Sequence, residues 1–108
     1  MTTGTAKKLA EVALSATTTT VLYTAPASTT AILKEIVLCN TDTVDRTVTI
    51  QAGSGTGVAS RILSAYSVKA GTTSIFTFST VVLTGETITG GASAASVVGC
   101  KISGGELV

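Results

Sequence analysis

The chain has 108 residues and a net charge of +1. Threonine and serine fill 33 positions (22 Thr and 11 Ser), whereas histidine fills none. Its seven basic residues are scattered, which argues against a nucleic-acid surface, since such a surface requires clustered Lys and Arg. The missing histidine removes the commonest general base and metal ligand, so the composition also argues against acid–base and metal chemistry.

Residues 1 to 10 show little hydrophobic pattern and are expected to form a short extended N-terminal arm before a single domain of residues 11 to 108. Lys7 and Lys8 form the only adjacent basic pair, which makes them candidate contacts to a partner. This start has no apolar stretch of the signal-peptide kind. No apolar run approaches the ~20 residues that span a bilayer, so no membrane partner is expected.

The first strands are predicted at Val21–Thr24, which ends before Pro26, and at Ala31–Asn40. A helix is the rival interpretation for the second segment, but its Ile and Val content favours a strand. Both faces of that strand are apolar apart from Lys34 and Glu35, so it is expected to be central and covered on both sides. Two interpretations of the charged pair stay open. Either it fixes the register of a subunit interface, or Lys34 reaches solvent at a sheet edge.

A polar turn at residues 41 to 45 precedes the segment 46 to 52, where apolar and polar side chains alternate. Val48 and Ile50 are expected to point inward and Gln51 outward. A period of two residues is typical of a half-exposed antiparallel strand.

The rest of the chain predicts short strands separated by turns. Residues 58 to 68 are compatible with an irregular strand or a helical turn. The other expected segments are strands at 74 to 79 (with Phe76 and Phe78 on one face), 81 to 83 and 86 to 89, a loop at 90 to 95, and a closing strand at 96 to 103. Strands spaced by about ten residues predict an all-β fold, an antiparallel β-sandwich that is jelly-roll-like.

Two cysteines, Cys39 and Cys100, would pair in an oxidising compartment. Since no export signal is visible, two buried free thiols are expected instead. Asp42 and Asp45 are the only carboxylates close together in sequence, and turn chemistry explains them. The sequence predicts no catalytic residue, no cofactor and no metal ligand.

Low charge and 44% hydrophobic residues indicate a surface that contacts a partner, and they favour a closed homo-oligomer, for example a trimer. The alternative is a compact domain whose outer face is covered by Thr and Ser hydroxyls. A carbohydrate-binding module is a further alternative, because sugar rings stack on aromatic platforms. Tyr23 and Tyr66 are its candidates, although their apolar neighbours predict that both are buried.

The segment from Leu22 to Thr41 resembles a recurring opening in small virion structural proteins of tailed bacteriophages. The shared elements here are Leu22-Tyr23-Thr24, Pro26, Thr30-Ala31, Lys34, Ile36 and Cys39-Asn40-Thr41, followed by a Thr- and Val-rich strand, Thr47-Val48-Thr49-Ile50. The similarity covers roughly residues 20 to 106 and has no catalytic residues to transfer.

The resemblance implies a small β protein carried on the assembled particle. Head (capsid) decoration is the first expectation, and a tail, collar or fibre-base component is the second. The implied partners are other virion proteins, either the major capsid protein or tail proteins. The implied location is the virion, after assembly in the cytoplasm of the host bacterium.

Overall fold

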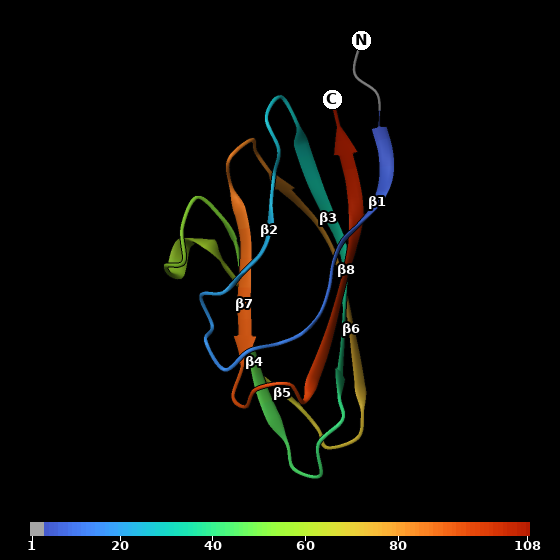
Figure 1. The fold of residues 1–108 in the computed structure, drawn as a ribbon, viewed down its shortest axis with the longest axis vertical. Helices are drawn as coiled ribbons and strands as arrows, with labels where there is room; N and C mark the ends of the chain where they lie inside the picture. The colour runs from blue at the N-terminus through green and yellow to red at the C-terminus, as the bar shows by residue number, and fades with distance from the viewer. Residues whose placement is uncertain (1–3) are drawn as a thin grey trace.

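The chain folds into two four-stranded antiparallel sheets packed face to face, as a computed structural model shows for residues 4 to 108 (Figure 1). The strands are β1 (Gly4–Ala13), β2 (Val21–Thr24), β3 (Thr30–Asn40), β4 (Arg46–Gly53), β5 (Arg61–Val68), β6 (Thr73–Val82), β7 (Thr87–Ala92) and β8 (Val98–Leu107). Sheet A has the order β1-β8-β3-β6 and sheet B the order β2-β7-β4-β5. The prediction of an all-β, jelly-roll-like sandwich is confirmed.

Several predicted segments differ from the observed ones in extent, and the closing strand expected at 96 to 103 is observed as β8 at Val98–Leu107. Residues 58 to 68 contain both expected alternatives in succession, a short 3-10 helix, η1 (Val58–Ser60), and then β5. The strands expected at 74 to 79 and 81 to 83 form the single strand β6. β7 runs into the expected loop at 90 to 95. Within residues 4 to 108, no helix has the length and apolar character needed to cross a membrane.

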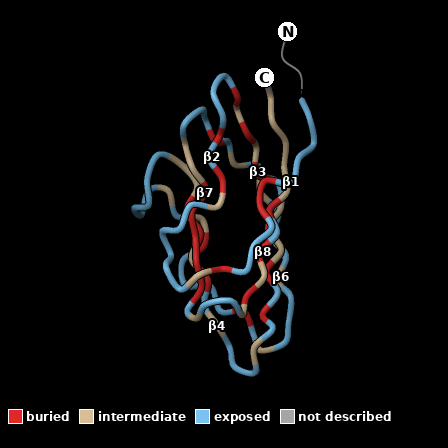
Figure 2. The backbone as a smooth tube through the Cα atoms, in the orientation of Figure 1, coloured by how far each residue is buried: buried red, intermediate tan, exposed pale blue. Residues whose placement is uncertain are grey.

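The core fills the space between the two sheets. Figure 2 shows the loops mostly exposed, and the edge strands β1, β5 and β6 are also largely exposed or half-buried. The largest side chains with almost no exposure are aliphatic apart from one glutamine: Leu14, Leu33, Ile36, Leu38, Val48, Ile50, Gln51, Val68, Val82, Ile88, Val98 and Ile102. Because inward residues of two facing sheets interdigitate, Val, Ile and Leu form this core without Trp.

Strand β3 changes its alternation at Lys34. Its register shifts between Leu33 and Glu35 against both β6 and β8. Leu33 is buried before the shift, and Ile36 and Leu38 are buried after it. The apolar residues on both predicted faces of this strand therefore reflect a β-bulge. The strand is central, as predicted, but the prediction that it is covered on both sides is wrong for this chain.

The segment between β1 and β2 covers part of sheet B. The amide of Ala92 in β7 donates to the carbonyl oxygen of Ser15 at 2.8 Å. A Cβ added to Gly91 would overlap the carbonyl oxygen of Thr17. β7 is therefore buried on its outer side as well. The covering segment comes so close to Gly91 that only glycine fits there.

Gln51 lies under the same covering segment and is only 1% exposed. Its predicted half-exposed position is wrong for this reason. With its amide nitrogen turned toward the segment, it donates to the carbonyl oxygen of Thr18 at 3.0 Å and to Thr89 Oγ1 at 3.0 Å. These bonds satisfy a buried polar group that would otherwise destabilise the fold.

The expected arm overlaps the first strand of sheet A. Residues 1 to 3 lie outside the described residues. Residues 4 to 10 belong to β1, which pairs with β8, and Leu9 and Ala10 are 7% and 8% exposed. This part of the expected arm is an edge strand of the sandwich. The division into an arm at 1 to 10 and a domain at 11 to 108 stays a prediction, and a deletion described in the Discussion tests it.

Candidate partner-binding surface

The surface of sheet A that points away from sheet B, here named the outer face, contains most of the predicted contact residues. The strand register places its side chains in rows across the sheet: Ala13–Gly99–Cys39–Thr73, Glu11–Lys101–Val37–Ile75, Lys8–Ser103–Glu35–Thr77 and Ala6–Gly105–Ile32–Val81. Charged residues occupy the middle of the face. Aliphatic residues flank them, and Ile75 and Val81 on β6 are 63% and 50% exposed.

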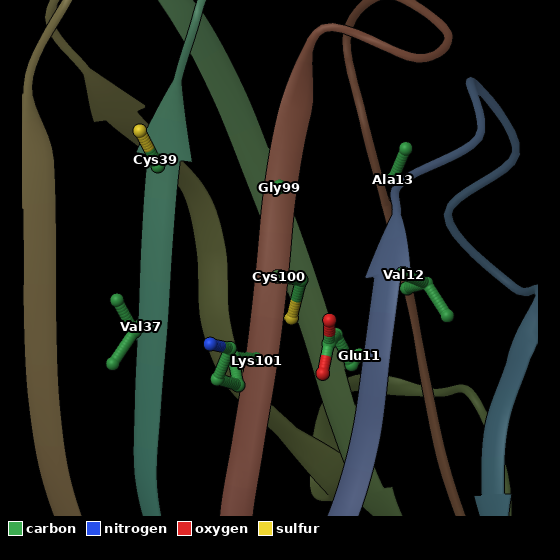
Figure 3. Close-up of a pocket in the computed structure, with 8 residues that line it drawn as sticks. All are labelled: Glu11, Val12, Ala13, Val37, Cys39, Gly99, Cys100 and Lys101. Carbon is green, nitrogen blue, oxygen red and sulfur yellow. The ribbon is translucent and has the colours of Figure 1, made fainter.

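Two hollows lie over β8 at glycine positions of the outer face. The first has a volume of about 450 Å³ and is lined by Glu11, Val12, Ala13, Val37, Cys39, Gly99, Cys100 and Lys101. Figure 3 shows it between β3 and β1, with β8 as its floor and no side chain at Gly99. The second, of about 280 Å³, lies beside Gly105 and Lys34. Both hollows exist because β8 has a glycine at these positions, where a side chain would otherwise fill the space between β1 and β3.

Lys34 and Glu35 both lie on β3, the third strand of sheet A, and therefore away from any sheet edge. Lys34 Nζ donates to Ser79 Oγ on β6 at 3.1 Å. Glu35 has no ion-pair partner among residues 4 to 108. The alternative that Lys34 reaches solvent at a sheet edge is wrong. Lys34 is exposed, but it lies on an inner strand of the open outer face. Their role in a subunit interface stays a prediction.

Lys7 and Lys8 point to opposite sides of β1. Lys8 Nζ pairs with Glu11 Oε1 at 2.5 Å, and this bond is the main cause of a lowered pKa of Glu11. Lys7 Nζ pairs with Glu106 Oε1 at 3.1 Å on the inward side. Of the two predicted contacts, only Lys8 shares the outer face with Lys34, and the role of each as a contact stays a prediction.

Tyr23, Glu106 and Lys7 form a polar cluster that links the two sheets. The Tyr23 hydroxyl donates to Glu106 Oε2, and Tyr23 is buried, as predicted. Burial raises the pKa of Tyr23 well above its ordinary value, and the neighbouring carboxylate adds to this. The hydrogen bond from Tyr23, and then that from Lys7, lowers the pKa of Glu106. The cluster is stable with a charged carboxylate and a neutral phenol.

We expect this cluster to make the stability of the fold sensitive to acid. A carboxyl whose pKa is lower in the folded than in the unfolded state contributes stability above its unfolded pKa near 4.5. That contribution is lost as the pH falls through the lower folded pKa. The melting temperature of the wild type should therefore fall more between pH 6 and pH 3 than the melting temperature of Glu106→Gln. Equal slopes for the two proteins would contradict the expectation, because Glu11, Asp42 and Asp45 titrate in both.

Three aromatic rings lie along the side of the sandwich where β5 and β6 are the outermost strands. Tyr66 and Phe76 pack edge to face with ring centroids 4.9 Å apart, and the Phe76 and Phe78 centroids are 6.3 Å apart. Phe76 and Phe78 share a face, as predicted. The prediction that Tyr66 is buried is wrong: it is 40% exposed, because β5 is an edge strand with no further strand to cover it.

The two cysteines are free thiols on opposite faces of sheet A. Cys100 is buried, and burial raises the pKa of its thiol to about 12. Cys39 is exposed on the outer face, so the prediction of two buried thiols holds for Cys100 only. The register pairs Cys39 with Gly99 and Cys100 with Leu38, which directs the two sulfur atoms to different sides of the sheet.

This arrangement predicts that the thiols differ in reactivity. A thiol reagent at pH 8 should label one cysteine in the folded protein and two after unfolding, since a buried thiol with a raised pKa is inert. Cys39→Ser should abolish the labelling of the folded state. A labelled Cys100 in the native protein would contradict the structure, as would a Cys39–Cys100 disulfide seen by mass spectrometry under non-reducing conditions.

Asp42 and Asp45 serve the turn between β3 and β4. Asp42 Oδ2 accepts from Arg46 Nη2 at 2.7 Å and from its Nε at 2.9 Å, which is the main cause of a lowered pKa of Asp42. Asp45 accepts from the Ala70 amide at 2.9 Å. Across residues 4 to 108, no three His, Cys, Asp or Glu side chains cluster as metal ligands would. Asp42 stabilises its own turn through Arg46, and Asp45 links that turn to the turn between β5 and β6.

No family model matches this chain, and no curated protein does. Among solved structures, the chain is similar to part of the structure of infectious bursal disease virus Gt strain, with a TM-score of 0.48 and 15% identity over 98% of this chain and 31% of that chain. It is also similar to part of the structure of infectious bursal disease virus Gx strain, with a TM-score of 0.49 and 17% identity over 99% of this chain and 32% of that chain. The chain spans about a third of the length of these two relatives.

Proposed function

We propose that this chain is a structural protein of a virus particle, namely a head decoration protein of a tailed bacteriophage that binds the assembled shell. The outer face of sheet A carries the proposal, because it combines exposed aliphatic side chains and two hollows with a central group of charged residues. A protein that docks on other proteins needs such a face. The resemblance of the segment from Leu22 to Thr41 to virion proteins supports the tailed-phage assignment.

The partner in this proposal is the major capsid protein, and the chain also associates with copies of itself. A shell presents many equivalent sites, so that several linked copies bind tightly although each contact is weak. A net charge of +1 leaves little repulsion between copies. A tail or collar position would use the same face on a different protein. Assembly in a bacterial cytoplasm is consistent with free thiols.

Purified phage particles test the proposal directly. Mass spectrometry of particles made by cells that carry the gene should detect this chain, and immunogold electron microscopy should place it over the heads. Gold confined to tails would move the assignment to a tail or collar component. Absence of the chain from washed particles would reject a virion role altogether.

A pair of variants tests the docking surface. Val37→Glu adds a charge at the centre of the outer face, whereas Thr47→Glu adds the same charge to an exposed position on sheet B. In particles assembled with each variant, we expect Val37→Glu to lower the copy number several-fold, because removing an added charge from water on docking is costly. Thr47→Glu should match the wild type. Equal incorporation of both variants would exclude the outer face as the docking surface.

The exposure of Tyr66 favours one second candidate, a carbohydrate-binding module. Its ring is 40% exposed, and the edge-to-face contact with Phe76 fixes its orientation. A glycan array discriminates between the two functions. Specific glycan binding that Tyr66→Ala abolishes would favour the carbohydrate-binding module. Absence of binding to any glycan on the array would reject that module.

A further inference from the structure

The edges of the two sheets differ in how they are protected against pairing with another chain. β1 has Lys7 and Lys8 and a register shift after them. β2 has only four residues and is soon followed by Pro26. β5 is interrupted by Ala65, whose φ of 47° is left-handed. Short length, lysine, proline and irregular backbone are the devices that keep an edge from recruiting a further strand.

β6 is an edge strand that carries none of these devices. It has ten residues, Thr73–Val82, without a charge, a proline or a glycine. Its exposed and half-buried residues alternate without a break, although β3 shifts its register beside it. Ile75 and Val81 are its two most exposed aliphatic side chains. As the last strand of sheet A, it presents backbone donors and acceptors on one side that pair with no other described strand.

We propose that β6 pairs with β6 of a second copy of this chain, in antiparallel orientation across a two-fold axis. The two copies of sheet A then form one continuous sheet. This contact specifies the self-association contained in the proposed function. The closed homo-oligomer expected from the sequence, for example a trimer, is then a dimer. The backbone hydrogen bonds of strand addition provide affinity, and the facing side chains provide specificity.

The side chains of β6 select one register for this pairing. Ile75 and Val81 are symmetric about Phe78, so the axis passes at Phe78. Ile75 then faces Val81 of the second copy, and Thr77 faces Ser79. Directly opposed side chains on one face of an antiparallel pair are in contact, so the two exposed aliphatic residues cover one another.

The charges on β3 support the same register. Glu35 lies beside Thr77, and Lys34 Nζ is bonded to Ser79 Oγ at 3.1 Å. With Thr77 opposite Ser79 of the second copy, Glu35 shares a row with the second copy's Lys34. A register shifted so that Thr77 faces Thr77 would instead align Glu35 with Glu35. Exposed charges about 14 Å apart, across three strand intervals, are largely screened at physiological ionic strength, so this complementarity favours the register weakly and mainly at low salt.

The mass in solution is the first test. Light scattering of the purified wild type should show a mass that rises with concentration toward twice the 10.7 kDa of one chain. Ile75→Lys should weaken dimerisation about tenfold or more, because it puts a charge on the paired edge. Val21→Lys, at a residue of β2 that is 57% exposed, is the matched control and should dimerise as the wild type does. A wild-type mass of one chain at all concentrations, or equal effects of the two lysines, would overturn the proposal.

Cysteine cross-linking tests the register. In a Cys39→Ser background, Thr77→Cys protein is mixed with Ser79→Cys protein that carries a mass label, and the mixture is oxidised. The proposed register yields the mixed disulfide dimer, since opposed residues lie within the span of a disulfide. Disulfides only between two Thr77→Cys chains, or no disulfide, would overturn it. If the pure protein forms dimers that never enter particles, the proposed function is rejected and the β6 contact stands. If the chain enters particles but is a monomer in solution, the β6 contact is rejected and the proposed function stands.

Discussion

Gly104→Ala is expected to destabilise the protein by about 3 kcal/mol or more, or to prevent folding. Gly104 lies on β8 beside the bulge of β3, and a Cβ at this position would overlap the carbonyl oxygen of Ile32. That oxygen belongs to the backbone of a central strand, which β6 and β8 hold from both sides. The clash cannot be relieved by turning a side chain, so the two strands must separate.

Urea unfolding followed by circular dichroism measures this effect. Gly55→Ala is the matched control, because a Cβ there meets nothing within 4 Å and Gly55 lies in an exposed loop. Its unfolding free energy should stay within about 0.5 kcal/mol of the wild type. Should Gly104→Ala unfold at the wild-type urea concentration, the close approach of β3 and β8 at the bulge would be refuted. Failure of Gly104→Ala to fold, with a folded Gly55→Ala, agrees with the expectation.

Deletion of residues 1 to 10 is expected to lower the unfolding free energy by about 3 kcal/mol or more. The deletion removes most of β1 and with it the buried side chains of Leu9 and Ala10. It also uncovers the edge of β8 and removes Lys7, the ion-pair partner of Glu106. Loss of a buried leucine alone costs about 2 to 5 kcal/mol, and an unpaired strand edge adds to the loss.

The melting temperature of the deleted protein checks this expectation, with Lys8→Ala as the control on the same strand. Lys8 forms only an exposed ion pair with Glu11, so its loss should change stability by less than about 1 kcal/mol. An unchanged melting temperature after deletion would support an arm of residues 1 to 10 that is separate from the domain. A large decrease would assign this segment to the sandwich.

The fold class could be predicted from the sequence because its signals are local. Alternating Thr and Val, turn residues between short segments and a single proline are enough to indicate an antiparallel sandwich. The position of Phe76 and Phe78 on one face follows from the same period of two. The end of a strand is harder to predict, since pairing with a neighbour can extend it past its local signal. β6 and β8 both run past their expected ends for this reason.

The features that were missed depend on residues far apart in the chain. Adjacent charges at Lys34 and Glu35 in an apolar strand are a signal of a bulge, which the expectation of a regular strand with two charged interruptions does not include. Gly90 and Gly91 predicted a loop, whereas they belong to β7 because the segment between β1 and β2 lies against that strand. The exposure of Tyr66 depends on the position of β5 in its sheet, which strand propensity does not specify.

The pairing of Gly4 with Leu107 brings both ends of the described chain to one tip of a molecule 49 Å long. Figure 1 shows the start of β1 beside the end of β8 at this tip, and the turn between β3 and β4 at the opposite tip. A short linker joining the ends would therefore close the chain into a ring without crossing the outer face. New ends opened in the exposed glycine loop before η1 would give a circular permutant with every strand intact.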